Sequence, residues 1–324
     1  MKSNLLSSLE ISSLLESRNF DDAVALLKST AYAKELSKLS SPSVWQIENA
    51  LLNCVLQDYE KLLVSVNGMP RSFLLHYKKK FEIEAIKSLL IMKSKGEEIK
   101  EYPWILEKAI SIPTAERLVD AKTPEELIEL LRFTRYYQIL QKVVTECDEK
   151  GTVYPYIKAL DTYQYGELRK IIKRKLGDRD KKIVGHLVGI EIDAKNLLIA
   201  LRIRGSDEED ILSWMVPMRY RLSDSDLTAA FNVTSLTELQ QVLRYYTDIV
   251  STSAKVCEET QSLFSLEQEF KRFILKENNR VFCGNRFHMG VPLAYLNLRE
   301  NEVRNITAIL HGKEEGLSTS KIEE

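Results

Sequence analysis

One sequence pattern recurs three times at an even spacing, and this repetition constrains the fold more than any other feature. The pattern combines acids with aliphatic residues and reads FEIEAIKSLLIMKSKG from Phe81, IEIDAKNLLIALRIRG from Ile190 and RENEVRNITAILHG from Arg299. The aligned acids Glu84, Asp193 and Glu302 are separated by 109 and again by 109 residues. Self-similarity at a fixed period is typical of a chain built from repeated structural units.

A second, unrelated pattern recurs in the same order. Helix starts with a capping residue are found in NFDDAVALLKSTAY from Asn19, TPEELIELLRFTRY from Thr123 and SLTELQQVLRYYTD from Ser235. In the Thr123 copy, threonine can cap, proline suits the first helical position and Glu126 can reach back to the cap amide. Amphipathic helices that resemble each other by chance are the alternative, but cap, spacing and terminal glycine recur together.

The two patterns together predict three units, each of about 105 residues. Proline and a loss of helical periodicity place the junctions near Tyr102-Pro103 and within Met215–Met218. We therefore expect units over 1–102, 103–217 and 218–324. Three units of similar shape can surround a pseudo-threefold axis and leave a central depression between them.

The composition favours helix throughout these units. Apolar residues recur at helical spacing, and the chain of 324 residues contains 12 glycines and 8 prolines, fewer than a β-rich fold needs for its turns. We therefore expect an all-α fold. The 46 basic and 47 acidic side chains leave no net field, which argues against a dedicated nucleic-acid-binding protein.

Neither a membrane span nor a disulfide framework is expected. The opening MKSNLLSSLE lacks the apolar segment of a signal peptide, and runs such as Leu89–Met92 are too short to cross a bilayer. The four cysteines, Cys54, Cys147, Cys257 and Cys283, are far apart in the sequence. We expect buried or half-buried free thiols of a reduced cytosolic protein.

Motifs for catalysis, cofactors or metals are not found. HGKEEG, from His311, lacks the preceding glycine and the following Ser or Thr of a phosphate loop, and no histidine has a second histidine three to five residues away. We expect no catalytic residue, cofactor or metal. The 14 tyrosines suit helix interfaces, but none is singled out.

A basic run spans residues 169–182, RKIIKRKLGDRDKK. It could contact phosphates or anionic lipid headgroups. We favour a solvated helix face, with Glu167, Asp178 and Asp180 as compensating acids, and rank a protein contact next.

The stretch EIDAKNLL, residues 191–198, resembles an active site when taken alone. Its acids Glu191 and Asp193 recur as Glu82 and Glu84, and again as Glu300 and Glu302. One active site does not need three copies of its acids. We interpret the stretch as the polar start of a helix that is used three times, where acids suit the positive end of the helix dipole.

The ordered pattern resembles the C subunit of the archaeal A-type ATP synthase, the relative of the d subunit in vacuolar ATPases. The resemblance covers essentially the whole chain and depends on IEIDAKNLLIALRIRG, on PLAYLNLRENEVRNI near the C-terminus and on RYRLSDSDL from Arg219. Family members usually begin with a Tyr- and Arg-rich segment that ends about where MKSNLL begins here. Either the segment is lacking or the start lies upstream, so its contacts are not assigned to this chain.

The resemblance implies a funnel of three helical domains that acts as a non-catalytic rotor part. Its closed face would rest on the membrane ring of proteolipid subunits, and its open cavity would receive the central stalk. It would transmit torque for ATP synthesis or hydrolysis coupled to proton or sodium transport. The expected location is peripheral, on the cytoplasmic side of the cell membrane. The alternative is a helical scaffold or adaptor unrelated to ATPases.

Candidate contact residues lie along the acidic pattern. We expect them either to hold the units together or to line the cavity: Glu84, Asp193, Asn196, Glu302, Arg304 and Asn305.

Overall fold

The computed structural model describes residues 4–97, 115–206, 210–285 and 287–323. In these ranges the chain forms helices joined by turns, with no strand, so the all-α prediction is confirmed. None of the described helices is both long enough and apolar enough to span a membrane. Cys54, Cys147 and Cys257 are buried free thiols, whereas Cys283 is exposed.

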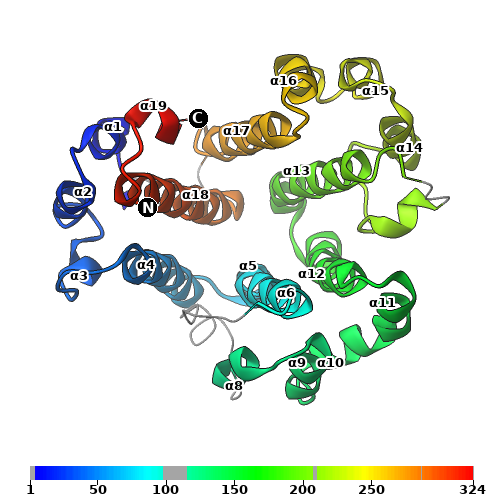
Figure 1. Ribbon diagram of the computed structural model, residues 1–324, viewed down its shortest axis with the longest axis horizontal. Coiled ribbons are helices and arrows are strands. Elements are labelled where there is room, and N and C mark those ends of the chain that lie inside the picture. Colours follow the sequence, from blue (N-terminus) through cyan, green and yellow to red (C-terminus); the bar gives the residue numbers. More distant parts are fainter. Residues whose placement is uncertain (1–3, 98–114, 207–209, 286, 324) are drawn as a thin grey trace.

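Long helices form an inner ring around a common centre (Figure 1). They are α4 (Val44–Ser65), α5 (Gly68–Lys78), α6 (Lys80–Ser94), α12 (Tyr154–Lys175), α13 (Asp178–Arg202), α17 (Phe264–Arg280) and α18 (Gly290–Glu314). Helices α5 and α6 follow one another with only Lys79 between them. The ring therefore consists of three hairpins: α4 with α5 and α6, α12 with α13, and α17 with α18.

Shorter helices cover the outside of this ring in three groups (Figure 1). The first group is α1 (Ser8–Glu16), α2 (Phe20–Leu27) and α3 (Ala33–Leu36). The second is α8 (Ala115–Asp120), α9 (Pro124–Leu130), α10 (Arg135–Leu140), η2 (Gln141–Val143) and α11 (Val144–Lys150). The third is η3 (Ile211–Trp214), α14 (Asp224–Asn232), η4 (Leu236–Glu238), α15 (Leu239–Val242) and α16 (Thr247–Thr260). The last helix, α19 (Thr319–Glu323), contacts α1 and α18.

Two of the three predicted side-chain caps form, but Glu126 accepts a hydrogen bond from the Lys122 amide and not from the expected cap amide. The side chain of Asn19 accepts a hydrogen bond from the Asp22 amide, and that of Thr123 accepts one from the Glu126 amide. The prediction of a cap at Ser235 is wrong. The Ser235 side chain accepts no such hydrogen bond, and a short 3₁₀ turn follows this residue. There Glu238 accepts hydrogen bonds from Thr234, and the Ser235 hydroxyl bonds the Thr237 hydroxyl instead of a backbone amide.

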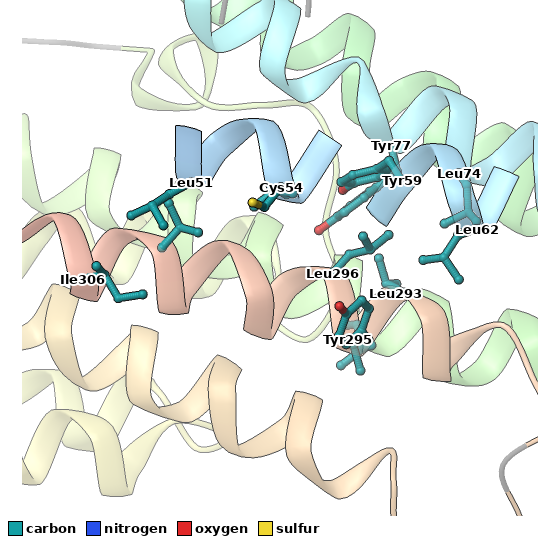
Figure 2. Close-up of a cluster of buried hydrophobic side chains, with 14 of the residues drawn as sticks. Leu51, Cys54, Tyr59, Leu62, Leu74, Tyr77, Leu293, Tyr295, Leu296 and Ile306 are labelled. Atoms are coloured by element: carbon teal, nitrogen blue, oxygen red, sulfur yellow. The ribbon is translucent and has the colours of Figure 1, made fainter. Parts of the chain in front are cut away.

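Three hydrophobic clusters form the core. One contains α6 residues such as Ile86 together with residues 118–160, and another contains the second half of α13 together with residues 211–270. The largest joins residues 14–77 to α18 and to parts of α12 and α13. Figure 2 shows this largest cluster, in which Leu51 lies near Ile306 and Leu62 lies near Leu293. Helices α4 and α18 are therefore antiparallel neighbours, although they come from opposite ends of the sequence.

The predicted boundaries of the three units remain a prediction. The Tyr102-Pro103 junction lies outside the described residues. The described clusters show that α6, α13 and α18 each pack against residues of another sequence segment: 118–160, 211–270 and 14–36. The hydrophobic packing thus links successive sequence units, and α18 links the last one to the first.

The interpretation of EIDAKNLL as a helix start is wrong. Glu191 and Asp193 lie in the middle of α13, and Glu300 and Glu302 lie in the middle of α18. Only Glu82 occupies a first turn, that of α6. Because the dipole effect fades beyond the terminal turn, these mid-helix acids need other partners. They receive hydrogen bonds from neighbouring elements.

Candidate functional site

A polar cavity of ≈ 670 Å³ lies between the inner helices. Every inner helix contributes to its wall. Its charged lining residues are Glu48, Glu84, Glu191, Glu300, Lys80, Lys271 and Arg304. Four acids and three bases face one space, so the cavity presents both signs of charge.

Hydrogen bonds among four helices form the floor of this cavity. The Tyr77 hydroxyl lies 2.7 Å from Asn297 Oδ1 and 3.1 Å from Glu191 Oε1. Asn297 Nδ2 donates to Asn278 Oδ1 at 3.0 Å. The floor therefore connects α5, α13, α17 and α18.

Apolar side chains close the molecule beneath this floor. One helical turn before Tyr77, Glu191 and Asn297 lie Phe73, Leu187 and Leu293, each at most 1% exposed. Residues four apart share a helix face, so these side chains form an apolar layer next to the polar one.

The apolar layer lies toward the three hairpin turns. Neighbouring hairpins pack antiparallel: His186 of α13 bonds Glu277 of α17, and Arg202 pairs with Glu267 further along. Likewise, the start of α5 packs in one cluster with the end of α12, and α6 packs with the beginning of α12. The turns at 66–67 and 176–177, the end of α17 and the start of α18 therefore lie at one end, the hairpin end. The cavity lies on the opposite side of the floor.

Ion pairs across helices reinforce the cavity wall. Glu300 of α18 lies 2.6 Å from Lys80 Nζ of α6 and accepts a hydrogen bond from Tyr59 of α4 at 3.0 Å. Asp161 of α12 lies between Lys87 of α6, at 3.0 Å, and Lys195 of α13, at 2.7 Å. Each acid thus joins helices from different hairpins.

Burial changes the acidity of two cavity carboxyls. Glu191 and Glu48 are half-buried, and burial raises the pKa of each above its ordinary value. Lys80 and the Tyr77 hydroxyl lower the pKa of Glu191, but not enough to offset burial. Arg304 and Lys271 are exposed in the cavity and form no ion pair with the described residues.

The six candidate contact residues separate into different surroundings. Glu84 and Arg304 line the cavity, and Glu84 also pairs with Lys87 at 2.8 Å. Asn305 is exposed. The other three are buried in contacts within the chain: Asp193, Asn196 and Glu302.

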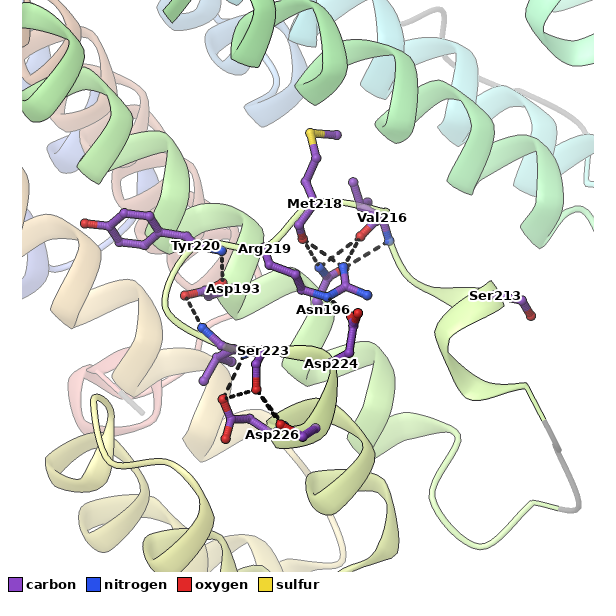
Figure 3. Close-up of polar contacts among 12 residues, drawn as sticks. Asp193, Asn196, Ser213, Val216, Met218, Arg219, Tyr220, Ser223, Asp224 and Asp226 are labelled. Carbon is purple, nitrogen blue, oxygen red and sulfur yellow. Dashed lines mark hydrogen bonds and ion pairs between the residues drawn. The ribbon is translucent and has the colours of Figure 1, made fainter. Parts of the chain in front are cut away.

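Asp193 and Asn196 hold the segment that follows η3 (Figure 3). Asp193 accepts hydrogen bonds from the amides of residues 220, 221 and 222 and from the Tyr246 hydroxyl. Asn196 bonds the amide and carbonyl of Val216 and the carbonyl of Met218. At Gly189, one turn before Asp193, an added Cβ would lie 2.3 Å from the Tyr220 ring, so only glycine fits there.

Glu302 joins α18 to the N-terminal segment. Its carboxylate accepts hydrogen bonds from the Leu6 amide at 2.6 Å and the Tyr32 hydroxyl at 2.7 Å. Arg299 bonds Glu302 at 2.7 Å, and its guanidinium lies 4.1 Å from the centre of the Tyr32 ring. Asp58 of α4 adds a second acid, 3.5 Å from Arg299.

Three tyrosine–carboxylate pairs were missed from the sequence. The hydroxyls of Tyr32, Tyr136 and Tyr246 donate to Glu302, Glu82 and Asp193, respectively. These tyrosines follow the caps Asn19, Thr123 and Ser235 by 13, 13 and 11 residues. That nearly constant offset is the signal that could have identified them. Each pair ties an outer group to a long inner helix.

Among the described residues, no group of three or more His, Cys, Asp or Glu side chains is arranged to hold a metal ion. The inner ring and its cavity define an all-helical protein with a polar cavity between its long helices. The chain belongs to the ATP synthase (C/AC39) subunit family, whose model matches residues 1–324. It is thus a subunit of a rotary ATP synthase, and an adaptor unrelated to ATPases is excluded.

Similar curated proteins are each named as the C subunit of an A-type ATP synthase. The protein of Methanocaldococcus jannaschii is 27% identical over 99% of this chain and 82% of its own length. That of Thermococcus kodakarensis is 26% identical over 100% of this chain and 87% of its own length. That of Methanosarcina mazei is 27% identical over 100% of this chain and 89% of its own length.

Proposed function

We propose that this chain is a non-catalytic central-rotor subunit, a socket that links the central stalk to the membrane proteolipid ring. It transmits torque for ATP synthesis or hydrolysis coupled to proton or sodium transport. The observation that carries the proposal is the polar cavity, which all inner helices line and an apolar layer closes toward the hairpin end.

The cavity is the surface that we assign to the stalk. A joint assembled from two folded parts needs polar contacts, because an apolar socket would be exposed to water before assembly. Arg304 and Lys271 point into this space without an ion pair among the described residues, so their charges are available for acids of a partner.

Torque transmission requires that the socket turns as one body. The ion pairs of Glu300 and Asp161 connect neighbouring hairpins, and the tyrosine pairs connect the outer groups to the ring. These cross-links resist shear between hairpins. In this arrangement the closed hairpin end faces the proteolipid ring, and the subunit lies at the membrane peripherally, on the cytoplasmic side.

Reversing the two cavity cations tests the proposal. In the variant Lys271→Glu with Arg304→Glu, affinity for the stalk subunits should fall at least about tenfold, a loss of roughly 1.4 kcal/mol. Binding of purified chain to stalk subunits, and mass spectrometry of proteins that co-purify from native membranes, provide the measurements.

The control is Lys34→Glu with Lys255→Glu, because both lysines are exposed on outer helices and the charge change is the same. The control should bind like the wild type. If the cavity variant also binds normally, or if neither stalk nor ring subunits co-purify with the wild type, the proposal is wrong.

A further inference from the structure

We propose that the hairpin end binds the headgroups of anionic phospholipids. The basic turn between α12 and α13 supplies the charge, and Phe287 enters the interfacial layer. The inference rests on the proposed function for its orientation, in which this end faces the membrane. The binding chemistry itself is argued from the hairpin end alone.

Positive charge is concentrated at this end. Residues 169–182 contain eight Lys and Arg against two Asp, whereas the whole chain has a net charge of −1. The eight basic residues are all exposed. The turn between α12 and α13 therefore carries a local excess of six positive charges on a nearly neutral molecule.

Most of these cations have no acidic partner in the described part of the chain. Lys170 pairs with Glu167 at 2.8 Å, and Arg179 donates to the carbonyl of Asn285 at 3.4 Å. Asp180, expected to compensate the run, instead accepts a hydrogen bond from the Met289 amide at 2.7 Å. The remaining cations form no ion pair with described residues: Arg169, Lys173, Arg174, Lys175, Lys181 and Lys182.

An exposed aromatic side chain lies beside this basic turn. Phe287 is 94% exposed, in the segment that joins α17 to α18. That segment is fixed against the first turns of α13 by the bonds from Arg179 to Asn285 and from Met289 to Asp180. Gly290 approaches Ile183 so closely that a Cβ would lie 2.4 Å from its side chain. The fold therefore holds Phe287 in water next to the cations.

The α4–α5 turn adds apolar groups at the same end. Val64 is 84% exposed at the end of α4, and Met69 is 44% exposed at the start of α5. Exposed apolar groups with surrounding cations match a membrane surface, which offers acyl chains beneath anionic headgroups. A nucleic acid would match the charge but offers no apolar layer to the hairpin turns.

Vesicle cosedimentation of the full-length chain tests the inference. The wild type should bind vesicles of phosphatidylcholine with 30% phosphatidylglycerol at least about tenfold more tightly than pure phosphatidylcholine. Replacing Lys173, Arg174 and Lys175 by glutamine should weaken binding to the anionic vesicles roughly 100-fold, because each cation near the surface contributes about fivefold. Phe287→Ser should weaken binding to the anionic vesicles by less than the triple variant does. Because the contribution of Phe287 is apolar, this loss should be the same at every salt concentration.

The matched control replaces three exposed lysines elsewhere by glutamine: Lys34, Lys122 and Lys255. The control should retain most of the anionic-vesicle binding. Equal loss in both triple variants, equal binding to both vesicle types, or binding to RNA or polyglutamate with none to vesicles would overturn the inference. The variant with Lys173, Arg174 and Lys175 replaced should keep its affinity for stalk subunits. A loss of lipid binding can therefore be told apart from a loss of stalk binding, which tests the proposed function.

Discussion

The carboxyl group of Glu191 shows how the cavity floor combines burial with hydrogen bonding. The single proton of the Tyr77 hydroxyl faces two oxygens, those of Asn297 and Glu191. Burial raises the pKa of Glu191 above its ordinary value, and the charged form of this carboxyl is therefore disfavoured in the folded protein. A carboxyl whose pKa is raised in the folded state stabilises the protein below its unfolded pKa. This contribution is lost as the pH rises through the folded value.

Glu191→Gln should therefore stabilise the protein relative to the wild type increasingly as the pH rises above 4.5, the ordinary value for glutamate. Glutamine stays neutral and its carbonyl oxygen can still accept from Tyr77. Urea unfolding at pH 5 and pH 8 measures the change. Glu259→Gln replaces an exposed glutamate of α16 and serves as the control. Its stability relative to the wild type should change little between pH 5 and pH 8. A variant whose stability relative to the wild type declines toward pH 8 would contradict the argument.

At the scale of single elements, the three tyrosine–carboxylate pairs perform the same task in three places. Each hydroxyl comes from the end of a short outer segment, and each acid comes from a long inner helix. Burial raises the pKa of all three tyrosines far above the usual value, so each remains a hydrogen-bond donor across the physiological pH range. The pairs fix how each outer group sits against the ring.

Phenylalanine at Tyr32, Tyr136 or Tyr246 should each lower the free energy of unfolding by about 1.5–3 kcal/mol, because a buried carboxylate loses a donor. Hydrogen exchange should increase in the outer group that carries the substitution. Tyr137→Phe is the matched control: this hydroxyl donates to Glu129 at the surface, so we expect little change in the free energy of unfolding. Equal effects of Tyr136→Phe and Tyr137→Phe would refute a special role for the pairs.

Sequence patterns predicted the elements better than their surroundings. The caps at Asn19 and Thr123 were predictable because a cap depends on residues within one turn. The burial of Asp193 and Asn196 was not, because their partners at 216–222 and Tyr246 lie 20 to 53 residues further on. The repeat at 109 residues aligned Asp193 with Glu302, but it aligned them with Glu84, whereas the tyrosine of that group bonds Glu82. It did not show that those acids lie in the middle of α13 and α18.

At the scale of the whole molecule, the ring is closed by contacts between distant parts of the chain. Arg299 of α18 is 3% exposed and lies among Asp58, Glu302 and the Tyr32 ring. Its main-chain partner is the carbonyl of Asn4, at 2.8 Å. The cavity could not be predicted in detail from the sequence, since its lining comes from all the inner helices and depends on this closure.

Arg299→Ala should destabilise the closure by about 3–5 kcal/mol, because the buried Glu302 would lose its cation, while Asp58 would keep only Lys61. Hydrogen exchange should rise in α1, α4 and α18 more than in α9 to α11. Arg272→Ala serves as the control. It removes a surface ion pair with Glu269, which has the same three-residue spacing as Arg299 and Glu302, and should lower the free energy of unfolding by at most about 1 kcal/mol. Uniform exchange across all helices in Arg299→Ala would show that the closure is not a local feature.

The membership of α18 in the largest hydrophobic cluster has a consequence for biosynthesis. The clusters over 83–160 and 194–270 draw their residues from continuous stretches, so each can form while the rest of the chain is still being translated. The cluster over 14–77 must wait for residues 293–310 to leave the ribosome. The first helices to be synthesised are thus the last to be buried, and their apolar faces need protection from aggregation during that interval.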